Sequence, residues 1–213
     1  SDACNNMFNG CTGITSVDLS SLTTLSGNNA CYGMFQNCTS LTSIDLSSLT
    51  TISGANVCSN IFWYCAGITT INLSNLTTVS GLNSCSGMFY NCSGLTSVNL
   101  SNLTTISGQG SCSGMFYYCT NLTSIDLSSL TTINARNACN NMFSYCTSLT
   151  TVYIGDTTAI NFGTYTNQFS NMFSGCTQNI DVYAPAANQS QIEAFSGYPN
   201  FSGSGTVTWH WRS

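Results

Sequence analysis

Thirteen cysteines carry the most reactive side chains of this chain, and twelve of them form six C-x6-C pairs. Thiols at a fixed spacing can form disulfides, hold zinc or pack as small apolar groups. Zinc is disfavoured, because its tetrahedral sites use C-x2-4-C or histidine ligands and His210 is the only histidine. The cysteines are Cys4 and Cys11, Cys31 and Cys38, Cys58 and Cys65, Cys85 and Cys92, Cys112 and Cys119, Cys139 and Cys146, and finally Cys176. The sequence predicts neither a metal nor any other cofactor.

The choice between disulfides and buried thiols depends on the segment between the paired cysteines. In a helix, cysteines seven residues apart lie about 10.5 Å apart along the axis, whereas a disulfide needs Cα atoms within about 7 Å. Phe169 stands where the partner of Cys176 should be, which indicates an apolar packing position. Free cysteine is also among the most buried residue types. Buried columns of thiols are therefore favoured, and disulfides, which an exported chain permits, stay the alternative.

The cysteines mark a unit of 27 residues that recurs down nearly the whole chain, which is the pattern of a solenoid. Residues 31–38 place Cys, Met, Phe and Cys at the i, i+3, i+4 and i+7 positions of one buried helical stripe. Residues 44–46 alternate as a short strand, with Ile44 and Leu46 facing inward. The sequence therefore predicts an α/β solenoid of 27-residue units, each with one short parallel strand and one short helix.

The last part of the chain departs from this repeat. Cys176 comes three residues late, and Val207, Trp209 and Trp211 alternate with polar residues as in an edge strand. We predict a solenoid of about seven units over residues 1–177 and a C-terminal capping region over residues 178–213. No N-terminal cap is apparent, so the first unit should expose an apolar end. That end predicts an upstream domain or self-association end to end.

The units resemble BspA-type leucine-rich repeats, in which a phenylalanine is followed three residues later by a cysteine and then by a leucine-rich strand. Residues 35–46 carry this motif as Phe-Gln-Asn-Cys-Thr-Ser-Leu-Thr-Ser-Ile-Asp-Leu, and residues 182–201 resemble the closing unit of the family. The resemblance covers roughly residues 4–201. It implies a leucine-rich repeat fold and a role in adhesion or partner binding on a bacterial, protozoan or phage surface. The extra cysteine at the start of each unit departs from the usual motif.

Charged residues make up 4% of the chain, which has no lysine and only two arginines. Nucleic-acid binding relies on Lys and Arg to displace counterions from phosphates, so it is excluded, as is a basic membrane-surface face. No run of 18 apolar residues exists, which excludes membrane insertion. Enzymatic activity is disfavoured, because the chain has one histidine, one glutamate and no nucleophile motif such as G-x-S-x-G. The nearly uncharged, hydroxyl-rich surface predicts an extracellular location: secreted, on a cell or on a virion.

Two surfaces are predicted to bind a partner. The residues after each Met-Phe pair lie off the buried stripe, so the central units should present aromatic side chains with polar tips. These are Trp63, Tyr64, Tyr90, Tyr117, Tyr118 and Tyr145. The exposed strand face should carry a second column, suited to hydrogen-bonding a sugar or an extended peptide. Its members are Asp18, Asp45, Asn72, Asn99, Asp126 and Tyr153. Each column also has a structural reading: packing between neighbouring helices for the first, and a solvated strand face for the second.

Three functions compete. The favoured one is adhesion or receptor binding, as a bacterial surface adhesin or the tip of a phage fibre, with a cell-surface glycan or protein receptor as partner. The second is a structural stalk or filament subunit that assembles end to end. The third is ice binding, because threonine pairs such as Thr50-Thr51 recur at regular spacing. The flanking Leu49 and Ile52 place these pairs in a turn rather than a flat strand, which ranks this function last.

Overall fold

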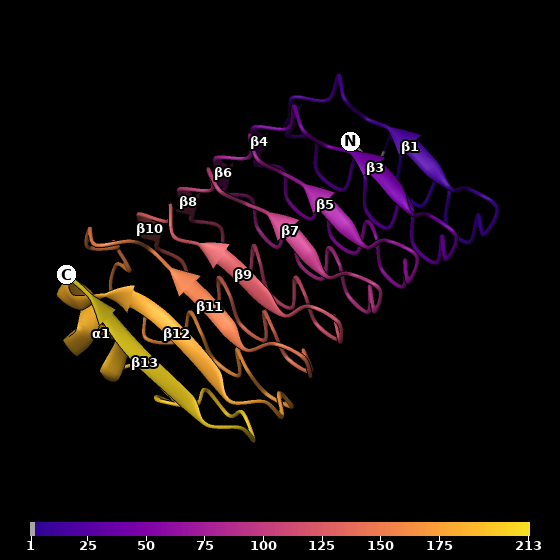
Figure 1. The fold of residues 1–213 in the computed structure, drawn as a ribbon. Coiled ribbons are helices and arrows are strands. Elements are labelled where there is room, and N and C mark those ends of the chain that lie inside the picture. The colour runs from indigo at the N-terminus through magenta and orange to yellow at the C-terminus, as the bar shows by residue number, and fades with distance from the viewer. Residues whose placement is uncertain (1–2) are drawn as a thin grey trace.

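A computed structural model describes residues 3–213 as a solenoid whose strands follow one another in a single row from the N-terminal to the C-terminal end (Figure 1). The row consists of β1 (Ser16–Asp18), β3 (Ser43–Asp45), β5 (Thr70–Asn72), β7 (Ser97–Asn99), β9 (Ser124–Leu127), β11 (Thr151–Ile154), β12 (Ile180–Pro185) and β13 (Val207–Arg212). The pairings are parallel and bring equivalent residues of successive units together, for example Ser16 with Ser43. The predicted strand of each unit is confirmed.

A second parallel sheet of five two-residue strands lies on another side of the solenoid. Its strands are β2 (Thr24–Leu25), β4 (Thr51–Ile52), β6 (Thr78–Val79), β8 (Thr105–Ile106) and β10 (Thr132–Ile133). In each strand the aliphatic residue is buried and the threonine is at least partly exposed. The expectation that the threonine pairs lie in a turn is therefore wrong for the second threonine of each pair. The aliphatic residue that follows the second threonine is buried in the core, and this burial holds the two-residue strand in an extended conformation.

The helix predicted in each unit is wrong. Residues 29–38 form overlapping turns in which N–H groups bond alternately within the unit and across to the next one. The Met34 N–H donates to the Cys31 carbonyl at 3.2 Å, whereas the Phe35 N–H donates to the Ile61 carbonyl at 2.9 Å. A helix would satisfy both groups internally. Within residues 3–213, the only helical elements are η1 (Ala186–Asn188) and α1 (Gln189–Glu193), at the C-terminal end (Figure 1).

The physical reason is a left-handed residue at every fourth position of this segment. Asn29, Gly33 and Asn37 have φ angles of 52°, 56° and 60°, a region that a right-handed helix does not contain. Glycine and asparagine adopt it with the least strain. The recurrence of Asn or Gly every four residues was the signal for turns, and the apolar spacing of the cysteines, Met34 and Phe35 concealed it.

Stacked phenylalanines fill the interior of the solenoid and form what we call the inner ladder. Its members are Phe8, Phe35, Phe62, Phe89, Phe116, Phe143 and Phe173. Neighbouring ring centroids lie 5.4–6.1 Å apart with planes within 14° of parallel. All but Phe8 are buried. Each such pair adds about 0.5–1.5 kcal/mol beyond the burial of its area, so the ladder joins successive units into one core.

The thirteen cysteines, all within the described residues, are free thiols. From the second pair on, the second cysteine donates its Sγ–H to the phenylalanine carbonyl of the preceding unit, as Cys92 does to Phe62 at 3.1 Å, and Cys176 does the same to Phe143. Burial raises the pKa of the Cys92 thiol well above its ordinary value and that of Cys65 to about 12. These thiols are thus neutral small groups that pack and satisfy a buried carbonyl.

Candidate functional site

The structure brings the six predicted aromatic residues together on the surface of the central units, as a continuous set that we call the ring column. It consists of Trp63, Tyr64, Tyr90, Tyr117, Tyr118 and Tyr145. Trp63 meets Tyr90 edge-on with ring centroids 5.7 Å apart, and Tyr90 stacks on Tyr117 at 4.7 Å. Tyr118 and Tyr145 stack at 4.5 Å with planes 5° apart. The predicted placement of these rings side by side is therefore observed, although turns rather than helices carry them.

Three tyrosines of the ring column occupy strained backbone positions. Tyr64, Tyr118 and Tyr145 have φ angles of 60°, 59° and 60°. In this left-handed region the Cβ crowds the following carbonyl oxygen, at a cost of roughly 1–2 kcal/mol per residue. Other units place Asn91 or Gly175 at the same position, where the strain is smaller. The tyrosines are therefore not required by the turn that holds them.

The ring column ends in small residues. At Gly175 a Cβ atom would lie 2.5 Å from the ring of Tyr145, so this ring covers the backbone of the following unit. At the other end, Tyr64 is 43% exposed, and Tyr118 within the column is 38% exposed. These two rings are the most exposed members of the column.

The ring column is electrically neutral. Burial, followed by the nearby phenols, raises the pKa of both Tyr90 and Tyr117, so both hydroxyls stay protonated at physiological pH. Each hydroxyl can therefore donate and accept a hydrogen bond. No charged residue occurs between Asp45 and Asp126, the stretch that contains five of the six rings. A ligand would thus meet ring faces and uncharged polar tips.

The second predicted column, on the strand face, has a structural role at five of its six positions. Asp18 Oδ1 accepts a hydrogen bond from the Ser20 N–H at 2.9 Å, which closes an Asx turn at the end of β1. The same contact recurs at Asp45, Asn72, Asn99 and Asp126. Hydrogen bonds from the side chain and backbone of Ser20 lower the pKa of Asp18. The repetition of Asp or Asn at this position is explained by the turn alone.

Tyr153, at the sixth position, begins a short aromatic stack that the sequence analysis missed. Its ring stacks on Tyr183 at 4.8 Å, and Tyr183 stacks on His210 at 4.6 Å. His210 Nε2 lies 2.8 Å from Asp181 Oδ1, and the guanidinium of Arg212 lies 5.8 Å from the Tyr153 ring centre. The repeat period separates Tyr183 from His210 in sequence, so the spacing could have revealed this pair.

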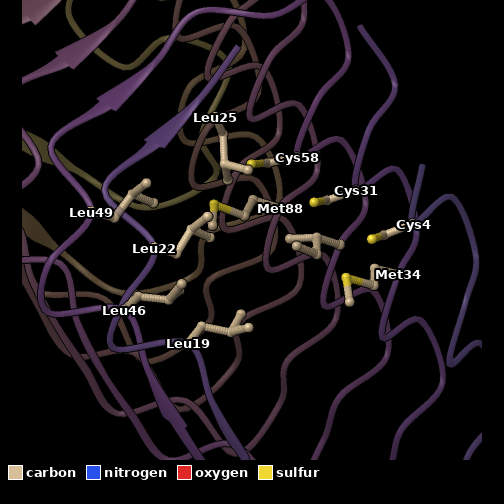
Figure 2. A pocket seen from close by; sticks show the side chains of 11 residues that line it. Cys4, Leu19, Leu22, Leu25, Cys31, Met34, Leu46, Leu49, Cys58 and Met88 are labelled. Carbon is tan, nitrogen blue, oxygen red and sulfur yellow. The ribbon is translucent and has the colours of Figure 1, made fainter. Parts of the chain in front are cut away.

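An apolar cavity of about 140 Å³ lies at the N-terminal end of the solenoid. Figure 2 shows leucines of the first two units on one side of it and the sulfur atoms of Cys4, Cys31 and Cys58 on the other. Leu22 at this end is partly exposed, whereas its equivalent Leu49 in the next unit is fully buried. The cavity is thus the uncovered end of the core, and its lining offers sulfur and hydrocarbon contacts.

Parallel strands that recur every 27 residues around a core of leucines and stacked phenylalanines define a leucine-rich repeat solenoid. The sequence model of the BspA type leucine rich repeat region, in six copies, matches residues 5–138 and 57–200. The chain belongs to this family, as the resemblance implied. The family is a repeat scaffold, typically on a surface or secreted and often involved in adhesion or protein binding.

Other comparisons add little to this assignment. No curated protein sequence matches the chain. Among solved structures, the chain is similar to a leucine-rich repeat protein from Bacteroides ovatus ATCC 8483, with 21% identity and a TM-score of 0.41. The alignment covers 97% of this chain and 56% of the Bacteroides protein. Over residues 3–213, no helix combines the length and the apolar character that crossing a bilayer requires.

Proposed function

We propose that the chain is an extracellular adhesion module that binds a neutral cell-surface glycan through the ring column. The observation that carries the proposal is the left-handed backbone of Tyr64, Tyr118 and Tyr145. Bulky rings stand there although asparagine or glycine serves in other units, and two of the three rings are exposed. Residues kept in a costly conformation cluster at functional sites, so contact with a ligand is the best reason for these tyrosines.

The chemistry of the ring column favours a sugar over a charged ligand. Aromatic faces stack on the apolar faces of sugar rings, while phenol hydroxyls exchange neutral hydrogen bonds with sugar hydroxyls. Tyrosine and tryptophan have few rotatable bonds, so little side-chain entropy is lost when a ligand orders them. The neighbouring stacks already hold the rings in place. An extended oligosaccharide that follows successive units would contact more of the column than a single sugar.

The state of the cysteines is compatible with the proposed extracellular location. An oxidising environment promotes disulfides between exposed thiols, but most of the cysteines are buried, and burial raises the pKa of thiols such as Cys92 and Cys112 well above the ordinary value. The thiolate is the reactive form, so the interior resists oxidation without forming bridges.

A glycan array tests this function with matched variants. Tyr64→Asn/Tyr118→Asn replaces two rings by the residue that Asn91 provides at the same backbone position, so the fold should persist. Tyr153→Asn, on the strand face, is the control. We expect the wild type and the control to bind the same neutral glycans and the double variant to lose them. Equal binding by the double variant would move the site away from the ring column, and a silent wild type would contradict glycan recognition.

A structural role as a subunit that assembles end to end is the second candidate, with an upstream domain as the alternative partner of the apolar N-terminal face. Met7 is 61% exposed there, and Leu22 lacks the cover that Leu49 has in the next unit. A head-to-tail contact of this kind propagates into a filament if it does not close. Sedimentation over a range of concentrations should then show growing assemblies that Leu22→Glu abolishes. A monomer at all concentrations would contradict this candidate.

A further inference from the structure

The two-residue strands carry an array of threonines that neither the core nor the ring column explains. Thr24, Thr51, Thr78, Thr105 and Thr132 are in register across the five parallel strands β2, β4, β6, β8 and β10. The residue before each of them is also a threonine, and these are Thr23, Thr50, Thr77, Thr104 and Thr131. Together the ten residues form two columns and five rows, which we call the threonine array. Neighbouring rows of a parallel sheet lie about 4.8 Å apart.

The first column of the threonine array is held rigid by its own hydroxyls. Thr77 Oγ1 donates to the Thr50 carbonyl at 3.1 Å, and Thr104 Oγ1 donates to the Thr77 carbonyl at 3.1 Å. The same contact occurs at Thr50 and Thr131. Each bond fixes the side-chain rotamer and leaves oxygen lone pairs free to accept hydrogen bonds.

The second column of the threonine array is held in place by the buried residues that follow it. The residue after each of its threonines is buried, as Ile52 and Val79 are, and this burial anchors the strand to the core. Within a row, Thr77 Oγ1 and Thr78 Oγ1 lie 3.5 Å apart, and the next row repeats this at 3.4 Å. The hydroxyls thus have one spacing along a row and another between rows, over five rows.

The three central rows of the threonine array lie in an uncharged stretch of the chain. No Asp, Glu, Lys, Arg or His occurs between Asp45 and Asp126, the stretch that holds the three central rows. The strands from β1 to β13, by contrast, carry Asp45 and Asp126, and Arg212 of β13 forms an ion pair with Asp156. Charged groups order water in their own hydration shells. Hydroxyl and methyl groups at fixed positions instead allow the neighbouring water molecules to adopt the spacing of the array.

We propose that the threonine array binds ice. Hexagonal ice repeats its oxygen atoms along one axis at a spacing close to that of parallel strands. A rigid column of hydroxyl oxygens at this spacing accepts hydrogen bonds from successive lattice waters, and the threonine methyl groups fill the gaps between them. The bound molecule then stops growth of the ice surface that it covers. This activity is independent of the ring column, which lies on another part of each unit.

Thermal hysteresis, the gap between the melting and freezing points of a single ice crystal in protein solution, tests the proposal. Thr78→Lys/Thr105→Lys introduces two charges into the centre of the array. Thr70→Lys/Ser97→Lys introduces the same charges at exposed positions of β5 and β7 in the same two units. We expect hysteresis and faceted crystals with the wild type, loss of both with the first variant, and retention of both with the second. Far-ultraviolet circular dichroism and thermal unfolding confirm that each variant is folded.

Three outcomes would overturn the proposal. The first is a wild-type protein that shows no thermal hysteresis and leaves ice crystals round. The second is equal hysteresis in the two lysine variants, since the array would then not be the contact. The third is binding to an insoluble polysaccharide that Thr78→Lys/Thr105→Lys abolishes while ice is unaffected, which would assign the array to a crystalline sugar. Tyr64→Asn/Tyr118→Asn should leave hysteresis unchanged, so failure here and failure of glycan binding are distinguishable.

Discussion

The inner ladder and the ring column are both stacks of aromatic rings, but they differ in where they occur and in how the backbone holds them. The inner ladder has one ring in each of seven units, nearly all buried. The ring column is confined to the central units, is partly exposed, and places three of its six residues in the left-handed region. The terminal units have Asn9-Gly10 and Ser174-Gly175 in its place.

Under the proposed function, this difference separates stability from recognition within one repeat. A ring that the solenoid needs occurs in every unit, because each unit must join its neighbours. Under the proposed function, a ring that occurs in some units only, in a conformation that asparagine adopts more easily, serves a ligand outside the fold. The comparison predicts that changes inside the solenoid cost stability, while changes in the ring column cost binding.

High pH should have the largest effect, and it acts on the interior. Burial raises the pKa of Cys92, Cys112 and Cys146 well above the ordinary value, and that of Cys176 to about 11. Between about pH 9 and these raised values the unfolded chain releases thiol protons that the folded chain retains. The free energy of unfolding therefore falls as pH rises, by up to about 1.4 kcal/mol per pH unit for each such thiol. Urea unfolding should show constant stability from pH 6 to 8 and a steep loss above pH 9.

A variant tests whether the thiols cause this loss. Cys112→Ala/Cys139→Ala should start from lower stability and show a shallower decline above pH 9. An equally steep decline would assign the effect to other groups, such as the phenols of the ring column.

Removal of one ring from the inner ladder should come next. Phe89→Ala leaves a cavity between Phe62 and Phe116, and truncation of a buried phenylalanine costs about 3–5 kcal/mol. Tyr90→Ala, one residue later, removes a partly exposed ring and should cost distinctly less. Urea unfolding of both variants measures the difference. Equal losses would break the distinction between the two stacks.

The two cysteine columns should respond differently to alanine. Cys92→Ala removes one of two donors to the Phe62 carbonyl, which keeps the Cys65 N–H at 3.1 Å. The lost hydrogen bond should cost about 0.5–1.5 kcal/mol, in addition to the packing lost with the sulfur. Cys85→Ala removes a buried thiol that faces the neighbouring thiol of Cys58 instead, so its loss should be smaller. A smaller loss at Cys92 than at Cys85 would show that the carbonyl contact contributes little.

Extension of the ring column should cost stability in a predictable way. Asn91→Tyr places a fourth tyrosine in the left-handed position, between Tyr64 and Tyr118, at a cost of roughly 1–2 kcal/mol. The added ring should strengthen binding of any glycan found on the array, because it closes the gap in that line of tyrosines. Unfolding and binding are measured on the same preparation; a variant that is more stable than the wild type would contradict the strain argument.

The 27-residue period was sufficient to predict the strands, the buried phenylalanines and leucines, and the members of the ring column. It was insufficient for the segment before each strand, because the spacing of Cys31, Met34 and Cys38 fits one face of a helix and also a run of turns. The left-handed positions decide between them, and Tyr64, Tyr118 and Tyr145 obscure the Asn/Gly pattern that marks them. The contact of Tyr153 with Tyr183 escaped prediction, because an insertion after Cys146 breaks the period between them, whereas the pair of Tyr183 and His210 keeps the period and was overlooked.

The stability of Tyr64→Asn/Tyr118→Asn tests the central claim most directly, since it asks whether the ring column supports the fold. The variant relieves left-handed strain of roughly 1–2 kcal/mol at each of two residues and loses five ring contacts. Both rings are exposed, so each contact should contribute at the lower end of about 0.5–1.5 kcal/mol, and the strain relief should offset the five together. We predict a free energy of unfolding in urea equal to or above that of the wild type. A loss of more than about 1 kcal/mol would show that the rings are structural and would contradict the assignment of the ring column to recognition.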